Sequence, residues 1–164
     1  QYDPAGDEAA ALVDAAAAMD LHVALLVRIE DERAHYPLMA VPAPPQASIL
    51  ALAERLAPRP LLLLNAYRWE LPAFAALEHV CFDLPYLEAA HPFAEVTAIV
   101  PPSRLLFGSH APLMYPAAQC RKLDHSDLPD ADRHAITSAN AIRLGFVPRD
   151  RLPAKATAQR PTDR

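Results

Sequence analysis

Short apolar runs alternate with helical patterns along most of this chain, and this alternation limits the folds that it can adopt. The runs rich in Leu, Val and Ile, with the length of buried strands, are 21–29, 60–66, 79–84 and 104–109. The helical patterns around them are 7–19, 48–57, 70–78, 93–100 and a last one from Pro129 to Phe146. The 18 prolines fall between the apolar runs and so mark the ends of regular elements.

This order of elements predicts an α/β protein with a parallel sheet, because a helix between two strands makes a crossover connection. The run 21–29 reads LHVALLVRI and is apolar on both faces apart from its ends, as in a strand buried between two layers. The chain has 164 residues, whereas a closed eight-stranded barrel takes about 250. We therefore expect about four strand–helix units, too few to close a barrel.

The composition is that of a folded protein with no affinity for polyanions. Apolar residues make up 52% of the chain and charged residues 21%, with a net charge of -5. We therefore expect neither nucleic acid nor an anionic membrane as a partner. No apolar run reaches the roughly 18 residues of a membrane span. Cys81 and Cys120 lack a metal-binding spacing, and the first residues lack the pattern of a signal peptide, so we expect a cytoplasmic protein.

Residues 149–164 differ from the rest of the chain. They are polar, interrupted by prolines and without periodicity. This pattern predicts a disordered C-terminal tail that follows a single domain over residues 1–148.

Three segments resemble the amidohydrolase-related family. Residues 105–112 read LLFGSHAP, where the last barrel strand of that family normally reads LLFGSDxP. Residues 138–144 read SANAIRL and resemble its closing helix, which carries NAxRL. Residues 27–33 (VRIEDER), followed by HYPL at 35–38, resemble a run after its fifth strand. The chain thus resembles the C-terminal half, strands five to eight, of a (β/α)8 TIM barrel of the metal-dependent hydrolase type.

The resemblance implies an activity and a cofactor. Members of the family hydrolyse amides or esters, or decarboxylate aromatic and related acids, with a divalent metal that is often zinc. The positions of the family's metal-site His, His and Asp correspond here to Leu26, Asn65 and His110. A zinc site takes about four N, O or S ligands, so these substitutions argue against a site of the family's kind in this part of the chain.

The candidate catalytic residues follow predicted strands. His110 could serve as a general base near neutral pH, or as the one histidine ligand of a metal. It could instead be a hydrogen-bonded histidine that shapes the rim of the barrel. The amide of Asn65 could stabilise a developing oxyanion or could cap the strand end. Asp83 could orient a neighbouring His or Arg, or cap a loop.

A second cluster of candidate residues follows the first predicted strand. Arg28, Glu30, Asp31, Arg33 and His35 place cations and acceptors within one short span. Arginine binds carboxylates through paired hydrogen bonds, so the cluster could bind an acidic substrate. The alternative is an internal ion-pair network that orders the following loop.

These observations lead to two hypotheses on function. The first is an amidohydrolase-like hydrolase that acts on a small, carboxylate-bearing substrate with degenerate metal ligands. The second is a barrel without catalytic activity that serves as a binding or assembly module. Because four parallel strands leave two open edges, we also expect the isolated chain to form a homo-oligomer, to aggregate or to remain molten.

Overall fold

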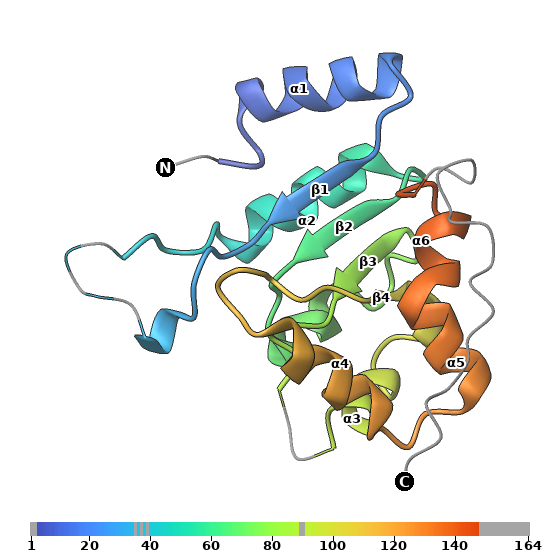
Figure 1. The fold of residues 1–164 in the computed structure, drawn as a ribbon. Coiled ribbons are helices and arrows are strands. Elements are labelled where there is room, and N and C mark those ends of the chain that lie inside the picture. Colours follow the sequence, from blue (N-terminus) through green and yellow to red (C-terminus); the bar gives the residue numbers. More distant parts are fainter. Residues whose placement is uncertain (1–2, 35, 37, 39, 89–90, 148–164) are drawn as a thin grey trace, which may run out of the picture.

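The computed structural model describes residues 3–34, 36, 38, 40–88 and 91–147, which form a parallel sheet with surrounding helices (Figure 1). The strands are β1 (Val23–Leu26), β2 (Leu61–Leu64), β3 (Val80–Asp83) and β4 (Leu105–Leu106). The α-helices are α1 (Asp7–Ala18), α2 (Gln46–Leu56), α3 (Pro92–Thr97), α4 (Pro116–Asp124), α5 (Asp130–His134) and α6 (Asn140–Arg143). Short 3-10 helices span Glu32–Ala34, Arg68–Phe74 and Pro102–Arg104, and a π-helical segment, Ala135–Ala139, joins α5 to α6.

The strands lie in the order β1-β2-β3-β4, and every pair is parallel. The register aligns one row of side chains across the whole sheet: Leu25, Leu63, Phe82 and Leu105. All members of this row belong to the buried core. The parallel α/β architecture predicted from the alternating pattern is therefore confirmed.

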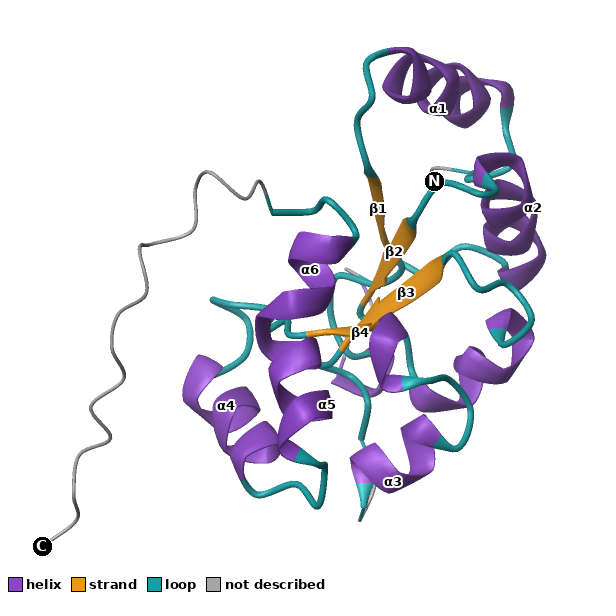
Figure 2. Ribbon diagram, turned by 90° about the vertical axis from the view of Figure 1, so that its right-hand side faces the viewer, coloured by secondary structure: helices purple, strands orange, loops and turns teal. Residues whose placement is uncertain are grey.

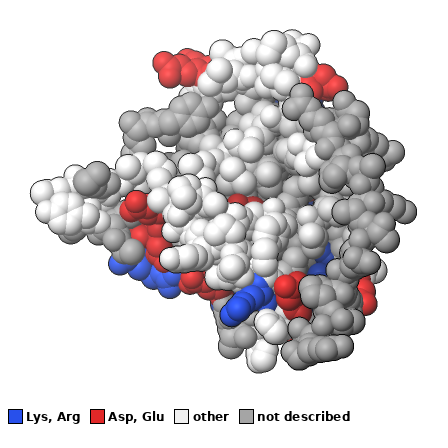
Figure 3. Space-filling view, in the orientation of Figure 1, with Lys and Arg blue, Asp and Glu red and all other residues white. Residues whose placement is uncertain are grey.

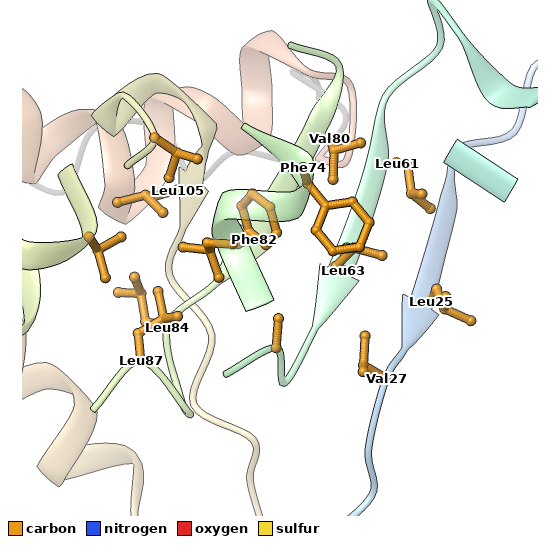
Figure 4. Packing of buried hydrophobic residues seen from close by; sticks show 14 of the residues in the cluster. Leu25, Val27, Leu61, Leu63, Phe74, Val80, Phe82, Leu84, Leu87 and Leu105 are labelled. Atoms are coloured by element: carbon orange, nitrogen blue, oxygen red, sulfur yellow. The ribbon is translucent and has the colours of Figure 1, made fainter. Parts of the chain in front are cut away.

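The core lies between one face of the sheet and the helices that cover it (Figure 4). Helix α2 buries Ile49, Leu52 and Leu56, which repeat at helical spacing and so share one face. Phe74, at the end of its 3-10 helix, packs against Phe82 with ring centroids 6.2 Å apart. Figure 2 shows α2 on one side of the sheet and α4, α5 and α6 on the opposite side of the molecule.

The other face of β1 and β2 carries no helix in front of it (Figure 1). Side chains alternate along a strand, so Leu26, Leu62 and Leu64 point to this face. Leu26 is 43% exposed, and Leu62 and Leu64 are half-buried. Charged side chains are few in the middle of this side of the molecule (Figure 3). Within the residues that the structure describes, no strand pairs with the outer edge of β1 or of β4.

Several elements differ from the sequence-based expectations. Each expected strand is present but shorter, at two to four residues. The expected helix 70–78 is a 3-10 helix that contains Pro72, which cannot donate the hydrogen bond of an α-helical interior. Helix α4 was not predicted, because it buries only Gln119 and Leu123 and so lacks a wide apolar stripe.

Two further expectations concern the C-terminal tail and membrane-spanning helices. The expected tail, 149–164, lies outside the described residues, and so does the boundary at residue 148. None of the described helices has both the length and the apolar composition that crossing a bilayer requires.

Candidate active site at the strand ends

Asn65 and His110 lie together at the edge of the sheet where the strands end. Asn65 follows β2 and His110 lies beyond β4, and Nδ2 of Asn65 is 3.0 Å from Nδ1 of His110. They meet although 45 residues separate them, because parallel strands all end at one edge of a sheet. The sequence prediction that both residues belong to this edge agrees with where the structure places them; their catalytic roles stay a prediction.

Both residues adopt the left-handed backbone conformation, with φ of 60° at Asn65 and 51° at His110. Few residues other than glycine adopt it, although Asn and His do so more often than most. Such conformations persist only where the surrounding structure holds them, and they are frequent at functional sites.

The hydrogen bonds around the pair fix the state of both side chains. Nδ2 of Asn65 donates to the main-chain oxygen of Arg28 over 2.8 Å, and Nε2 of His110 lies 2.7 Å from the main-chain oxygen of Ile29. A carbonyl oxygen only accepts, so the neutral ring carries its proton on Nε2 and leaves Nδ1 unprotonated. Nδ2 of Asn65 lies 3.0 Å from Nδ1 and 3.3 Å from Nε2, so the amide lies over the ring. Turning the amide of Asn65 over would put its oxygen against two acceptors. Oδ1 of Asn65 therefore stays in the interior, where none of the described residues forms a hydrogen bond with it.

Arg28 is buried in an internal ion pair. Its two terminal nitrogens donate to the two carboxylate oxygens of Glu70 over 2.8 and 2.6 Å, and one of them also donates to the main-chain oxygen of Asn65. The guanidinium carbon lies 3.8 Å from the centre of the Tyr67 ring. The structure thus places Arg28 beneath the Asn65–His110 pair, in the kind of ion-pair network that the sequence left open as an alternative.

Arg33 and Asp31 lie further out, on the rim. Arg33 donates to the carboxylates of Asp31 and Glu88, and its side chain is 60% exposed. The hydrogen bonds from Arg33 hold the pKa of the Asp31 carboxyl well below its usual range, and Tyr67 adds a further hydrogen bond over 2.9 Å. Burial, followed by this contact with Asp31, raises the pKa of Tyr67.

The remaining predicted substrate-binding residues are placed only in part. Glu30 is exposed and adjoins Ile29, the residue whose oxygen faces the His110 ring. His35 lies outside the described residues. Of the predicted set, Asn65, His110 and Arg28 form one connected network, and Tyr67 links that network to Asp31 on the rim.

Asp83 is a buried carboxyl next to the pair. Its Oδ1 accepts the main-chain N–H of Asn65 over 2.7 Å, and the residue is 5% exposed. Burial raises the pKa of Asp83 to about 7. Tyr86 was not considered from the sequence, and its ring lies edge-on to His110 with centroids 5.6 Å apart. Its position just after β3, at the same edge of the sheet, was the signal that could have identified it.

A hollow adjoins this site at the free edge of β1. It has a volume of about 390 Å³ and is lined by Leu25–Ile29 of the strand and by Ala40, Val41, Pro42 and Pro44 of the following loop. A second hollow, of about 240 Å³, lies between α3 and α5 and includes His91, Lys122 and His125. It is lined by none of the candidate residues. The first hollow is lined by Arg28 and Ile29, whose main-chain oxygens contact Asn65 and His110.

The residues at the family's metal positions do not by themselves form a metal site. Leu26 has no ligand atom, Asn65 is directed by its bonds to Arg28 and His110, and both nitrogens of His110 are engaged. Among the residues that the structure describes, no three His, Cys, Asp or Glu side chains are grouped so that they could hold a metal ion. A metal centre at this edge would need ligands from elsewhere.

The sequence matches no protein-family model and no curated protein. The fold matches solved structures at low sequence identity. A 2,6-dihydroxybenzoate decarboxylase in complex with 2,6-dihydroxybenzoate aligns with a TM-score of 0.66 and 12% identity, over 88% of this chain and 56% of that one. A Staphylococcus aureus protein assigned to the amidohydrolases aligns with a TM-score of 0.63 and 13% identity, over 89% and 61%.

A third structure carries a metal. It is a dihydroxybenzoic acid decarboxylase from Polaromonas with bound manganese and the inhibitor 2-nitroresorcinol, with a TM-score of 0.59 and 14% identity over 86% of this chain and 54% of that one. The chain therefore spans little more than half the length of the structures that it matches. At this identity the likeness establishes the fold and confirms the expectation of a partial barrel. The described residues have the fold of about half of an amidohydrolase-type TIM barrel.

Proposed function

We propose that this chain supplies the site-bearing strand ends of an amidohydrolase-like enzyme that acts on a small, carboxylate-bearing substrate. The Asn65–His110 pair is the observation that supports it most directly. Nδ2 of Asn65 is a donor and Nδ1 of His110 is an acceptor, 3.0 Å apart. A water molecule or a substrate hydroxyl that displaces their mutual contact could donate to His110 and accept from Asn65 at once.

This arrangement suits hydrolysis or another reaction that needs proton transfer. His110 would accept a proton at Nδ1, the nitrogen that holds the lone pair. The freed amide of Asn65 would donate to an oxygen that gains negative charge in the transition state. Catalytic hydrogen bonds are often rearranged when a substrate binds, so the present contact between the two side chains is compatible with these roles.

Arg33 is the better candidate for binding a substrate carboxylate. The partners of Arg33, Asp31 and Glu88, are accessible to solvent, so exchanging them for a ligand costs little. Arg28 is 3% exposed and is bound by Glu70 through two hydrogen bonds. Removing the partner of a buried charge costs several kcal/mol, which makes Arg28 a structural residue of the site in this proposal.

In this proposal, a divalent metal would need ligands from outside the described part of the chain. The manganese in the Polaromonas structure shows that this fold can carry a metal. The described residues lack the ligand set, so the roles proposed for Asn65 and His110 do not depend on a metal.

The second candidate function is a barrel that binds a ligand without turning it over. It is supported by the internal hydrogen bonds of His110, because both ring nitrogens already have protein partners. It predicts binding of a carboxylate-bearing compound with no product formed.

The test is a substrate survey with the protein from the complete reading frame. Small amides, esters and aromatic acids would each be tried with a free carboxylate and with that carboxylate replaced by an amide. Arg33→Gln is expected to raise KM about tenfold for the carboxylate compounds alone, because a hydrogen bond to a charged group is lost. Arg55→Gln is the matched control, since Arg55 forms an exposed ion pair with Asp14 away from the site. Binding without turnover would favour the second function; an equal effect of both variants would exclude Arg33 as the anchor.

A further inference from the structure

Asp83 lies between the two residues of the candidate site. It ends β3, the strand between β2 and β4, and pairs in register with Leu106 of β4. Its side chain is on the face of the sheet opposite to Phe82, which points into the core. The carboxyl is therefore placed between the end of β2 and the end of β4.

The contact with Asn65 explains why a carboxyl is useful at this place. Its Oδ1 accepts the main-chain N–H of Asn65 over 2.7 Å, and this N–H belongs to a residue in the left-handed conformation. An N–H at the end of a strand has no ladder partner of its own, and leaving it buried and unpaired would cost free energy. The carboxyl thus stabilises the backbone turn that directs the Asn65 amide to His110.

No cation holds Asp83 in place among the described residues. The nearby ammonium group of Lys122 donates instead to the main-chain oxygens of Leu84 and Leu87, over 2.8 and 3.3 Å. Burial raises the pKa of Asp83 and lowers that of Lys122, so both groups carry a cost of desolvation. If Asp83 only filled space, an apolar residue could take its place without this cost of desolvation.

Gly108 makes the second contact of Asp83 with the site. A Cβ atom at residue 108 would lie 2.9 Å from both Cβ and Oδ2 of Asp83, which is closer than real Cβ atoms approach. Gly108 is two residues before His110 in the segment that follows β4. The Asp83 side chain therefore meets the backbone of both segments that carry the candidate catalytic residues.

We propose that Asp83 is a positioning residue, which acts through the main chain of Asn65 to hold the Asn65 amide against His110. It fixes the left-handed turn at Asn65 and so holds the amide against the His110 ring, whose proton faces the oxygen of Ile29 at Nε2. The catalytic meaning of this role rests on the proposed function, but the role itself is a property of the folded chain.

The test is ¹⁵N NMR of the full chain with labelled histidine and asparagine. In the wild type the two ring nitrogens of His110 are expected to give well-separated signals, one protonated and one accepting. In Asp83→Ala the signal of Nδ1 should shift, because the Asn65 amide no longer lies against the ring. Exchange of the Asn65 main-chain amide with solvent should become about tenfold faster, as expected for loss of a buried hydrogen bond. Asp83→Asn keeps an oxygen acceptor and is expected to restore both signatures.

Cys81→Ala is the control, because Cys81 is buried on the same strand and the same face and does not contact Asn65. Unchanged His110 signals in a folded Asp83→Ala variant would overturn the proposal, as would equal changes in the control. If Asp83→Ala does not fold, Asp83→Asn decides: wild-type signatures support the proposal and lost signatures in a folded protein refute it. None of these measurements needs a substrate, so an inactive protein would refute the proposed function without affecting this result.

Discussion

The side-chain nitrogen of Asn65 lies 3.0 Å from Nδ1 of His110, while both residues hold the left-handed backbone conformation. This relationship joins the ends of two strands that are separated by a third, β3. The main-chain oxygens of Ile29 and Arg28 give the histidine one defined tautomer and the asparagine one defined orientation.

The left-handed backbone and the amide of Asn65 contribute separately to stability. Asn65→Gly keeps the conformation and removes only the amide, which is expected to cost about 1 to 3 kcal/mol because the oxygen of Arg28 loses its donor. Asn65→Ala should cost about 1 kcal/mol more, since alanine is disfavoured at positive φ. Urea unfolding of the two variants measures the difference, and equal stabilities would contradict it.

The ion pairs of Arg28 and Arg33 should differ in their effect on stability. Glu70→Ala leaves the buried guanidinium of Arg28 without its partner and is expected to cost about 3 kcal/mol or more. Arg33→Ala breaks only exposed pairs, so its cost should stay within about 1 kcal/mol. Midpoints of urea unfolding at one ionic strength give the comparison. Similar losses for the two variants would show that Arg28 is not the buried support described above.

Asp83 makes the stability depend on pH in a definite direction. Burial raises the pKa of Asp83 in the folded state to about 7 from the ordinary 3.8, so the folded state holds this proton more tightly than the unfolded state. The favourable contribution is complete below about pH 4 and is lost as the pH rises to about 7. Burial lowers the pKa of Lys122 to about 8 from 10.5, so this group affects stability at higher pH. Its effect has the opposite sign, because stability rises as the pH rises from about 8 to about 10.5.

The measurement is the free energy of unfolding at pH 5 and pH 7.5 for the wild type and for Asp83→Asn. The wild type should lose stability relative to the variant as the pH rises, because the variant has no carboxyl to ionise. Parallel pH profiles for the two proteins would mean that the carboxyl titrates normally.

The open face of the sheet should make the isolated chain associate. Leu26 is 43% exposed beside the free edge of β1, and two hollows of about 390 and 400 Å³ border that strand. Exposed apolar strand edges promote pairing with other chains. We expect dimers or larger species in size-exclusion chromatography, and fewer of them for Leu26→Glu. A monodisperse monomer that melts cooperatively would contradict this prediction.

Much of the fold could be predicted from the sequence because its signals are local. The leucine runs around Leu25 and Leu63 have the length and composition of buried strands, and the helical spacing of Ile49, Leu52 and Leu56 marks the buried face of α2. Helix α4 gave no such signal. It begins at Pro116 and is otherwise mostly polar or small, so only its contacts identify it.

The candidate site could be predicted only as a set of residues. Polar residues that follow parallel strands share an edge, which placed Asn65 and His110 in one region. Their direct contact depends on two left-handed turns, and no local pattern in the sequence signals those turns. The partner of Arg28 is Glu70, 42 residues away, so the sequence could not distinguish a substrate anchor from an internal ion pair.

The most direct test of the account is the turnover number of the complete protein with and without the His110 side chain. On a carboxylate-bearing substrate found in the survey, His110→Ala is expected to lower kcat about 100- to 10,000-fold, the usual contribution of a general acid or base. His134→Ala is the control, since His134 lies exposed on α5. A loss confined to His110→Ala would support proton transfer at the Asn65–His110 pair. Unchanged turnover in His110→Ala would contradict it.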